Sequence, residues 1–390
     1  MKMRRILILA LAVMVMLAMT AVPTFAATKQ AVQVADKYYS YNEVAGDYLL
    51  SSEWQRDYKD GFLQTHKSIS YLRNYEDPSK VDSKSNFEVS AKYTNNGMLK
   101  KRIMKYDDGS KLEATYSYKG KNVTTFITKY KGKNSNKTAY TYNKKGLITK
   151  QTNYYYESGK WVKGSYTKYT FDSKGRETKY EYYSKDNPDE PKLKRQNWYE
   201  VSYSGKKRTE KHYNYEDKMV GKYVYTMDSK GRDKKLVQTS IYYFTDQDPQ
   251  ETTSTTTYTY YNNGQLKKES TKGDGYTETR TFRSDGQMLS QKSKGTDYER
   301  STEISYNKKG LITKEVSTYT HNSTDENGET VTDTTKDTWK YKYEGYYKNK
   351  YPKVIYMSHN GQKYSKEEKT YKYIVDKTPA EVLNIGMGAG

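Results

Sequence analysis

Short polar segments between glycine-closed turns form the dominant pattern of this chain. Residues 142–150 read Tyr-Asn-Lys-Lys-Gly-Leu-Ile-Thr-Lys, and residues 306–314 repeat them exactly in order. Segments such as 166–171 and 255–260 consist largely of threonine and aromatic residues, which favour strands. We therefore predict an all-β fold, a repetitive and aromatic-rich array of antiparallel hairpins. The array is either an extended single-layer sheet or a solenoid-like shell.

The turns of this array are predicted from an Asn or Asp that precedes a Gly. In the turn 143–146, Asn suits the first position of a type I turn and Gly suits a positive φ, as in a three-residue hairpin loop. Shorter Asn-Gly and Asp-Gly sites at 263–264, 285–286 and 360–361 predict two-residue primed turns. The glycines expected to close turns in the repeat region are Gly146, Gly175, Gly231, Gly264, Gly286 and Gly310.

The hairpin closed by residues 172–175 shows what each face of the sheet would carry. The simplest register places Lys168 opposite Tyr180 on one face and Tyr169 opposite Lys179 on the other. Neither face is then plainly apolar, unlike a sandwich strand with one buried side. We expect a sheet that is wetted on both sides, or one whose buried side is built from tyrosine.

The composition supports a folded chain with a thin core. Hydrophobic residues make up 34% of the 390 residues and the mean hydropathy is −1.13, yet the chain contains 46 tyrosines, against 7 phenylalanines and 4 tryptophans. A disordered chain would lack such aromatics. A buried tyrosine covers ~150–250 Å² while its hydroxyl still requires a partner. The core is therefore expected to be half polar.

The N-terminal residues 1–26 have the pattern of a signal peptide. Lys2, Arg4 and Arg5 precede an apolar run over residues 6–20, and small residues before position 27 predict cleavage after Ala26. An uncleaved N-terminal anchor is the alternative. There is no cysteine, so neither a lipid-modified cysteine nor a disulfide framework is expected. An exported chain of this kind fits a bacterium, and no later segment is apolar enough to span a membrane.

The remaining chain divides into three predicted parts. Residues 27–95 form a β lead-in or cap, residues 96–375 form the repeat region, and residues 376–390 form a flexible tail. The formal net charge of +21 becomes +18 once the three basic residues of the signal peptide are removed. This excess of positive charge predicts attraction to anionic surfaces.

One motif of the repeat region resembles that of a known family. Residues 171–176 read Phe-Asp-Ser-Lys-Gly-Arg, and residues 227–232, 142–147 and 306–311 are variants of the same phrase. The pattern is similar to the tyrosine-aspartate (YD) repeat of RHS-type bacterial surface and toxin proteins, and it covers about 270 residues of the chain. The resemblance implies an extracellular β-repeat protein, for which carbohydrate binding or adhesion is often proposed. No segment resembles a toxin domain, so a toxin role is not implied.

Motifs of catalysis or metal binding are absent from the sequence. The four histidines are His66, His212, His321 and His359. Their spacing does not match a metal site, and the acidic clusters at 186–190 and 325–329 lack the spacing of a calcium loop. There is no glycine-rich phosphate loop and no nucleophile elbow. We predict a protein without metal, cofactor or catalytic residues; a glycoside hydrolase is the less favoured alternative.

Aromatic and lysine residues form the one predicted ligand surface. Trp339, Tyr341 and Tyr343 alternate along one segment, with Lys340 and Lys342 on its other side. Flat rings stack on the C–H faces of sugars, and lysines attract phosphate or carboxylate groups. The opposing interpretation is that these rings only form the core and cross-strand pairs. The candidate ligand-binding residues are Trp161, Tyr180, Tyr182, Trp198, Trp339, Tyr341 and Tyr343.

The sequence thus predicts a non-catalytic binding protein, secreted and possibly associated with the cell wall. Its expected partner is an anionic cell-wall polymer or polysaccharide. The alternative is a structural or adhesive module that meets other surface proteins through its sheet edges. Basic sheets with aromatic residues also stack nucleic-acid bases, but export of the chain argues against nucleic acid as a partner.

Overall fold

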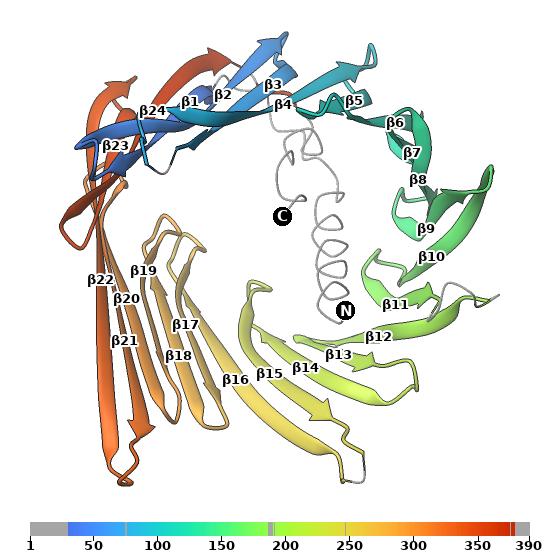
Figure 1. Ribbon diagram of the computed structural model, residues 1–390. Coiled ribbons are helices and arrows are strands. Elements are labelled where there is room, and N and C mark those ends of the chain that lie inside the picture. The colour runs from blue at the N-terminus through green and yellow to red at the C-terminus, as the bar shows by residue number, and fades with distance from the viewer. Residues whose placement is uncertain are drawn as a thin grey trace. The chain divides into compact units, whose positions relative to one another are not determined.

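The computed structural model describes residues 30–74, 76–185, 190, 192–245, 247–374 and 376–378. Over these residues the regular structure is all β and consists of 24 strands, which confirms the predicted fold class. Antiparallel pairing joins neighbouring strands into a run of hairpins (Figure 1). The predicted signal peptide and most of the predicted tail lie outside the described residues.

The described chain divides into two compact units. Unit 1 comprises residues 30–137, 343–356 and 364–378, and unit 2 comprises residues 138–342 and 357–363. The strands wholly within unit 1 are β1 (Gln30–Asn42), β2 (Asp47–Lys59), β3 (Phe62–Arg73), β4 (Val81–Tyr93), β5 (Leu99–Lys105), β6 (Lys111–Lys119) and β7 (Asn122–Tyr130).

Unit 2 contains most of the repeat region. Its strands are β9 (Ile148–Glu157), β10 (Lys160–Phe171), β11 (Glu177–Ser184), β12 (Lys194–Ser204), β13 (Lys207–Tyr213), β14 (Met219–Met227), β15 (Asp233–Tyr242), β16 (Gln250–Tyr260), β17 (Leu266–Gly273), β18 (Tyr276–Phe282), β19 (Met288–Lys294), β20 (Tyr298–Tyr306) and β21 (Ile312–Thr324). Both units receive residues from β8 (Lys133–Tyr142), β22 (Thr330–Tyr347), β23 (Tyr351–His359) and β24 (Gln362–Ile374).

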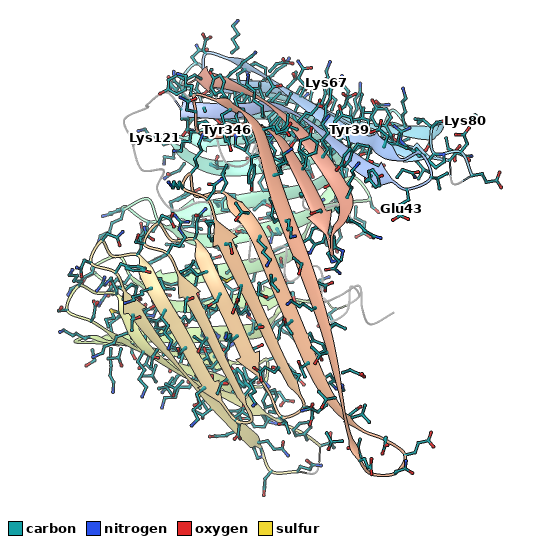
Figure 2. The ribbon with its side chains drawn as sticks, turned by 90° about the vertical axis from the view of Figure 1, so that its left-hand side faces the viewer. Tyr39, Glu43, Lys67, Lys80, Lys121 and Tyr346 are labelled. Carbon is teal, nitrogen blue, oxygen red and sulfur yellow. The ribbon has the colours of Figure 1, made fainter. Side chains whose placement is uncertain are left out.

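In unit 1 the first strand has partners on both edges. β1 pairs antiparallel with β2 and also with β24, so that Tyr38 lies opposite Ser52 on one side and opposite Glu367 on the other. The Tyr39 hydroxyl, labelled in Figure 2, donates a hydrogen bond of 3.0 Å to Glu368. This double pairing leaves β1 without the exposed edge that invites aggregation. The predicted boundary at residues 95 and 96 falls between β4 and β5 of the same unit.

A small apolar cluster forms the core of unit 1. Leu63, Val89 and Leu99 are almost completely buried, and Tyr58 and Tyr93 are among the residues packed against them. The chain after β24 returns to this region. The Lys377 N–H donates to the Gly61 carbonyl at 2.8 Å, and the Leu63 N–H donates to the Thr378 hydroxyl at 2.9 Å. Residues 376–378, the described part of the predicted tail, are therefore held against the start of β3.

The six predicted turn glycines have φ between +76° at Gly310 and +90° at Gly264. In the turn at Gly146, the Gly146 N–H donates to the Asn143 carbonyl at 3.0 Å, which gives the predicted three-residue loop. The turns at Gly264 and Gly286 have the same bonds and begin at Tyr261 and Arg283. The prediction of two-residue turns was wrong for these two, because the residue before the Asn or Asp-Gly site supplies the first position.

The prediction of a two-residue turn is confirmed for the loop between β23 and β24. Asn360 and Gly361 both have positive φ, at +49° and +89°, and strand structure resumes directly at Gln362. A type I′ turn requires positive φ at both central residues, and Asn-Gly is its preferred sequence.

The predicted register of the β10–β11 hairpin was wrong by one residue. Phe171 lies opposite Glu177, but an extra residue on β11 then shifts the ladder, so that Tyr169 lies opposite Tyr180 and Lys168 opposite Glu181. A bulge of this kind places two residues of one strand against one of the other. Register shifts beside the turn also occur in the hairpins β4–β5, β14–β15, β16–β17, β18–β19 and β20–β21.

The shifted register sorts the side chains of unit 2 onto two different faces. We define the tyrosine face by Tyr169, Tyr180, Tyr199, His212 and Tyr223, whose rings follow one another across β10 to β14. We define the lysine–aromatic face by the residues that project from the opposite side of β9 to β13: Lys150, Lys163, Tyr166, Lys168, Lys179, Glu181, Tyr183, Arg195, Trp198 and Tyr213. One side of this sheet is built largely from tyrosine, as expected from the sequence, but the rings of the tyrosine face are half-buried and not fully buried.

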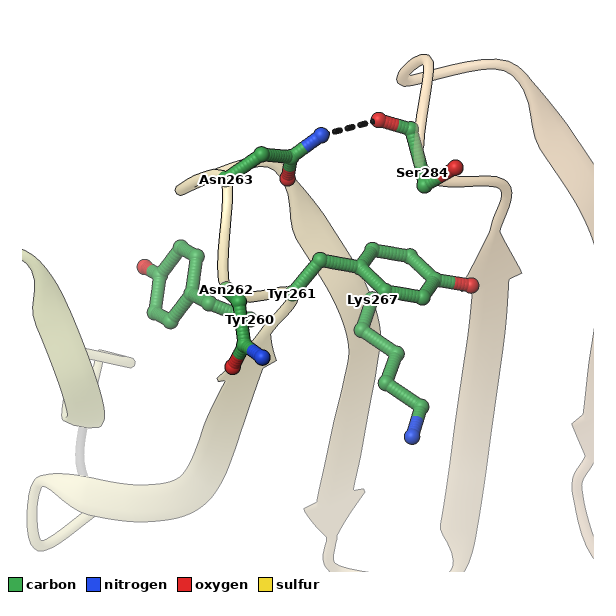
Figure 3. Close-up of a pocket in the computed structure, with 6 residues that line it drawn as sticks. All are labelled: Tyr260, Tyr261, Asn262, Asn263, Lys267 and Ser284. Carbon is green, nitrogen blue, oxygen red and sulfur yellow. Dashed lines mark hydrogen bonds between the residues drawn. The ribbon is translucent and has the colours of Figure 1, made fainter.

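A repeated tyrosine contact ties five of the bulges to a later strand. The acceptor is the backbone carbonyl two residues after a turn glycine, and the donor is the hydroxyl of a tyrosine from the next hairpin. The pairs are Tyr93 with Leu63, Tyr118 with Leu99, Tyr203 with Glu177, Tyr260 (drawn in Figure 3) with Asp233, and Tyr306 with Met288, at 2.5 to 3.1 Å. We call this the tyrosine–bulge contact. It satisfies a carbonyl at a break in the ladder and a half-buried hydroxyl at the same time.

Candidate ligand-binding surface

The lysine–aromatic face of unit 2 is built around two stacked ring pairs. The rings of Tyr166 on β10 and Tyr183 on β11 have centroids 4.4 Å apart and an interplanar angle of 12°. The rings of Trp198 on β12 and Tyr213 on β13 are 3.9 Å apart at 6°. In each pair the residues lie directly opposite each other in the ladder, where side chains approach most closely.

Three lysines surround the ring of Tyr166. Their ammonium nitrogens lie 4.9 Å (Lys150), 4.3 Å (Lys163) and 5.7 Å (Lys168) from the ring centroid. Lys168 also lies 5.3 Å from the ring of Tyr183. These distances fit cation–π attraction, which holds an ammonium group over an aromatic ring.

The same three lysines repel one another. The pKa of Lys163 lies below its ordinary value, first because of burial and then because of the positive charges of Lys150 and Lys168. Among the described residues no carboxylate lies within ion-pair distance of Lys150 or Lys163. Lys168 faces Glu181 across the ladder and helps to lower the pKa of that carboxyl. The cluster thus retains uncompensated positive charge.

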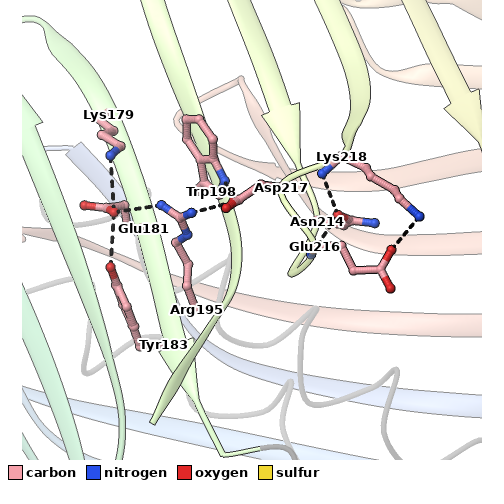
Figure 4. Close-up of polar contacts among 9 residues, drawn as sticks. All are labelled: Lys179, Glu181, Tyr183, Arg195, Trp198, Asn214, Glu216, Asp217 and Lys218. Atoms are coloured by element: carbon pink, nitrogen blue, oxygen red, sulfur yellow. Dashed lines mark hydrogen bonds and ion pairs between the residues drawn. The ribbon is translucent and has the colours of Figure 1, made fainter.

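Glu181 is the central carboxylate of the neighbouring part of this face (Figure 4). It accepts a hydrogen bond of 3.1 Å from the Tyr183 hydroxyl, and it forms ion pairs with Lys179 at 3.3 Å and Arg195 at 3.4 Å. Burial alone would raise the pKa of Glu181, but the hydrogen bond and charge of Lys179 bring this pKa below its ordinary value. Glu181 is therefore ionised at neutral pH and fixes two cations on the face.

The turn between β13 and β14 extends the face beyond Trp198. The indole N–H of Trp198 donates to Asp217 at 2.7 Å, and Arg195 also contacts Asp217. In the same turn Lys218 forms an ion pair with Glu216 at 2.8 Å (Figure 4). Arg195 also lies 4.9 Å from the ring centroid of Trp198, so the ring and two carboxylates together set its position.

The rings of this face therefore form cation–π contacts with basic side chains. Lysines and Arg195 occupy positions over Tyr166, Tyr183 and Trp198. The expectation that open ring faces stack on sugars does not describe this arrangement. What the face offers is a row of positioned ammonium and guanidinium groups on successive strands, which lie ~4.8 Å apart.

The tyrosine face uses its polar groups internally. The rings of Tyr180 and Tyr199 stack with centroids 4.9 Å apart at 3°, and Tyr199 stacks in turn on His212 at 4.9 Å. The Tyr199 hydroxyl donates to Glu177, and burial raises the pKa of both groups. This face resembles a core of cross-strand pairs more than a ligand surface.

The predicted binding residues do not share one surface. Trp161 and Trp198 lie on the lysine–aromatic face, where Trp161 packs edge-on against Tyr156 at 4.9 Å. Tyr180 and Tyr182 lie on the tyrosine face. The one-residue shift beside the turn decides this division, and it is not visible in the sequence.

The alternation predicted around Trp339 is present in β22. Trp339, Tyr341 and Tyr343 are half-buried, and Lys340 and Lys342 between them are exposed. The ring of Trp339 stacks on His359 with centroids 4.4 Å apart. Trp339 and Tyr341 belong to unit 2 and Tyr343 belongs to unit 1.

The candidate residues predicted from the sequence do not include the lysines that carry the charge of this face, Lys150, Lys163 and Lys168, or the ring of Tyr166. The spacing of these residues could have indicated the cluster. Lys163, Tyr166 and Lys168 lie on one strand, and Lys150 lies directly opposite Lys168 on β9. Their convergence depends on a second register shift beside Gly164.

Within the described ranges no group of three or more His, Asp or Glu side chains could hold a metal ion. Asp186 and Asp189 of one predicted acidic cluster fall outside those ranges. No helix in the described part of the chain combines the length and the apolar composition needed to cross a membrane.

Comparison with known proteins gives no family. No family model matches the chain, and no curated protein matches it. It is similar to a solved DUF3836 family protein from Bacteroides vulgatus ATCC 8482, with 15% identity over 21% of this chain and 87% of that chain, at a TM-score of 0.18. It is also similar to the solved structure of TcdB2-TccC3-TEV. The identity is 10%, the match covers 84% of this chain and 21% of that chain, and the TM-score is 0.30.

A third similar structure is a porin-like protein from Bacteroides vulgatus ATCC 8482. The identity is 13%, the match covers 57% of this chain and 98% of that chain, and the TM-score is 0.20. Identities and TM-scores this low carry no argument about function. The resemblance to YD repeats thus stays a prediction from the sequence.

Proposed function

We propose that this protein is a non-catalytic, exported binding protein that holds an anionic cell-wall polymer or polysaccharide on its lysine–aromatic face. The observation that supports the proposal is the cluster of Lys150, Lys163 and Lys168 around Tyr166. The signal-peptide pattern of residues 1–26 and the excess of basic residues, 68 against 47 acidic residues, are consistent with it.

The lysine cluster has a physical reason to bind an anion. Three ammonium groups held around one ring repel one another, and the lowered pKa of Lys163 expresses that repulsion together with burial. A phosphate or carboxylate group among them would relieve the repulsion and form charge-assisted hydrogen bonds. A polymer with repeated charges could also reach Lys179 and Arg195 on the next two strands, where each side chain is already fixed by Glu181.

Retention on purified polymers tests this proposal. The mature chain is mixed with purified bacterial cell wall, with polygalacturonate and with neutral dextran, at low salt and at high salt. We expect retention on the wall and on polygalacturonate at low salt, loss of that retention at high salt because exposed charges are screened, and no retention on dextran. Absence of retention on both anionic polymers at low salt would contradict the proposal.

A further inference from the structure

A hollow of about 390 Å³ lies in unit 2 between the β16–β17 turn and the β18–β19 turn (Figure 3). It is lined by Tyr260, Tyr261, Asn262, Asn263, Lys267 and Ser284. These residues belong to none of the strands that form the lysine–aromatic face. Asn262, Asn263, Lys267 and Ser284 are exposed, so the hollow is a shallow depression of the surface.

Hydrogen bonds to the backbone hold the walls of this hollow in place. The Tyr260 hydroxyl donates to the Asp233 carbonyl at 2.6 Å, and the Tyr261 hydroxyl donates to the Phe282 carbonyl at 2.7 Å. The side-chain amide of Asn263 donates to the Ser284 carbonyl at 2.7 Å and joins the two turns (Figure 3). The two rings are therefore in position before any ligand arrives, which lowers the entropic cost of binding.

Two polar side chains in the hollow have no hydrogen-bond or ion-pair partner among the described residues: the amide of Asn262 and the ammonium group of Lys267. Both side chains are exposed to solvent. Lys267 lies 5.7 Å from the ring centroid of Tyr261, and no carboxylate lines the hollow. Figure 3 shows the rings of Tyr260 and Tyr261 on either side of Asn262.

We propose that this hollow binds one sugar unit that carries a negative charge. The ring of Tyr261 offers apolar surface to the C–H groups of a pyranose, whereas the ring of Tyr260 packs under Arg232 and forms a wall of the hollow. The Asn262 amide can both donate to and accept from sugar hydroxyls. Lys267 supplies the only charge among the lining residues, and it selects a carboxylate or a phosphate on the sugar. The site is separate from the lysine–aromatic face and does not rest on the function proposed for that face.

Small sugars of defined charge test this site. Binding to the full mature chain is measured by saturation-transfer NMR and calorimetry with trigalacturonate, glucose 6-phosphate and neutral galactotriose. We expect binding of at least one charged sugar and about fivefold weaker binding of galactotriose, since an exposed charge pair contributes up to ~1 kcal/mol. Which charged sugar binds identifies the anionic group.

Variants locate the binding to the hollow. Lys267→Gln and Asn262→Ala are each expected to lower the affinity for the charged sugar about fivefold. Lys268→Gln is the matched control, because it removes the same charge from the adjacent exposed position of β17 without lining the hollow. Unfolding curves in urea verify that the variants are folded.

Three outcomes would overturn this inference. They are no binding of either charged sugar, equally tight binding of galactotriose, and equal effects of Lys267→Gln and Lys268→Gln. Retention on cell wall through the lysine–aromatic face is measured separately, so a failure of this site and a failure of the proposed function are distinguishable.

Discussion

The ring of Tyr203 lies beneath the guanidinium group of Arg176, with the guanidinium carbon 3.9 Å from the ring centroid. The hydroxyl of the same ring donates to the backbone carbonyl of Glu177 at 3.1 Å. Arg176 also pairs with Asp172 at 2.7 Å across the turn. One tyrosine thus connects to the aspartate, arginine and bulge of the preceding turn.

The same arrangement recurs in a later hairpin. Arg232 pairs with Asp228 and lies 4.2 Å from the ring centroid of Tyr260, whose hydroxyl donates to the Asp233 carbonyl. In the contacts of Tyr203, Tyr260 and Tyr306 the ring packs under an arginine while its hydroxyl is satisfied by a carbonyl. The tyrosine–bulge contact therefore gives these tyrosines a structural role in a polar chain without a thick apolar core.

Removal of one such hydroxyl should lower stability measurably. Tyr203→Phe keeps the ring under Arg176 but leaves the Glu177 carbonyl without its donor. We predict a decrease of about 1 kcal/mol in the free energy of unfolding, the usual contribution of one such hydrogen bond. Urea unfolding is the measurement. Tyr242→Phe is the control, because Tyr242 is 51% exposed, and an equal loss in both variants would count against the contact.

The turn glycines should be sensitive to any added side chain. Gly231 has φ of +77°, and a Cβ added there would meet no atom within 4 Å, so that only backbone strain opposes a substitution. We predict that Gly231→Ala lowers the free energy of unfolding by about 1–2 kcal/mol. Gly231→Asn should lower the free energy of unfolding by less than Gly231→Ala, since asparagine tolerates the left-handed region better than alanine. Equal stability of the alanine variant and the natural chain in urea would refute this.

The hairpin at residues 172–175 shows how far the sequence predicts the fold. Its turn follows from local chemistry, since Asp at the first position and Gly at the positive φ are required by the loop. The strand register beyond Glu177, two residues after Gly175, cannot be predicted from this turn chemistry. At this bulge the Glu177 carbonyl accepts a hydrogen bond from Tyr203 of the next hairpin, a contact that is remote in sequence.

That bulge also limits what could be predicted of the binding surface. A shift of one residue exchanges the faces of all the following side chains. It places Tyr180 beside Tyr169 on the tyrosine face and leaves Lys168 with Glu181 on the other. Aromatic content and charge were readable from the sequence, but the assignment of each ring to a face was not.

His66 gives unit 1 a dependence of stability on pH. Burial, followed by the charge of Arg56, lowers the pKa of His66 to about 4. The Arg56 Nε–H donates to His66 Nδ1 at 3.2 Å, which requires the unprotonated nitrogen. The unfolded chain binds a proton at about pH 6.5 and the folded chain does so only near pH 4. Stability that is present above pH 6.5 is therefore lost as the pH falls toward 4.

His66→Gln removes this titration. We predict that urea midpoints of the natural chain fall between pH 6.5 and pH 4 more steeply than those of the variant. The difference between the two curves isolates His66 from the carboxylates that titrate at lower pH. Parallel curves over that interval would show that His66 is not held in its neutral form.

The lysine cluster around Tyr166 is the centre of the proposed binding surface. The test is the dissociation constant for polygalacturonate, measured at several salt concentrations, of a variant in which Lys150, Lys163 and Lys168 are all replaced by Gln. The control variant carries Gln at three exposed turn lysines of the same unit, Lys174, Lys230 and Lys308, and so has the same net charge.

Three exposed charge contacts at about 0.5 kcal/mol each amount to roughly a tenfold change in the dissociation constant. We predict that the cluster variant binds polygalacturonate about tenfold more weakly at low salt and with a smaller dependence on salt, while the control variant binds almost as tightly as the natural chain. Equal weakening in the two variants would show that net charge alone attracts the polymer, and it would contradict a defined site on the lysine–aromatic face.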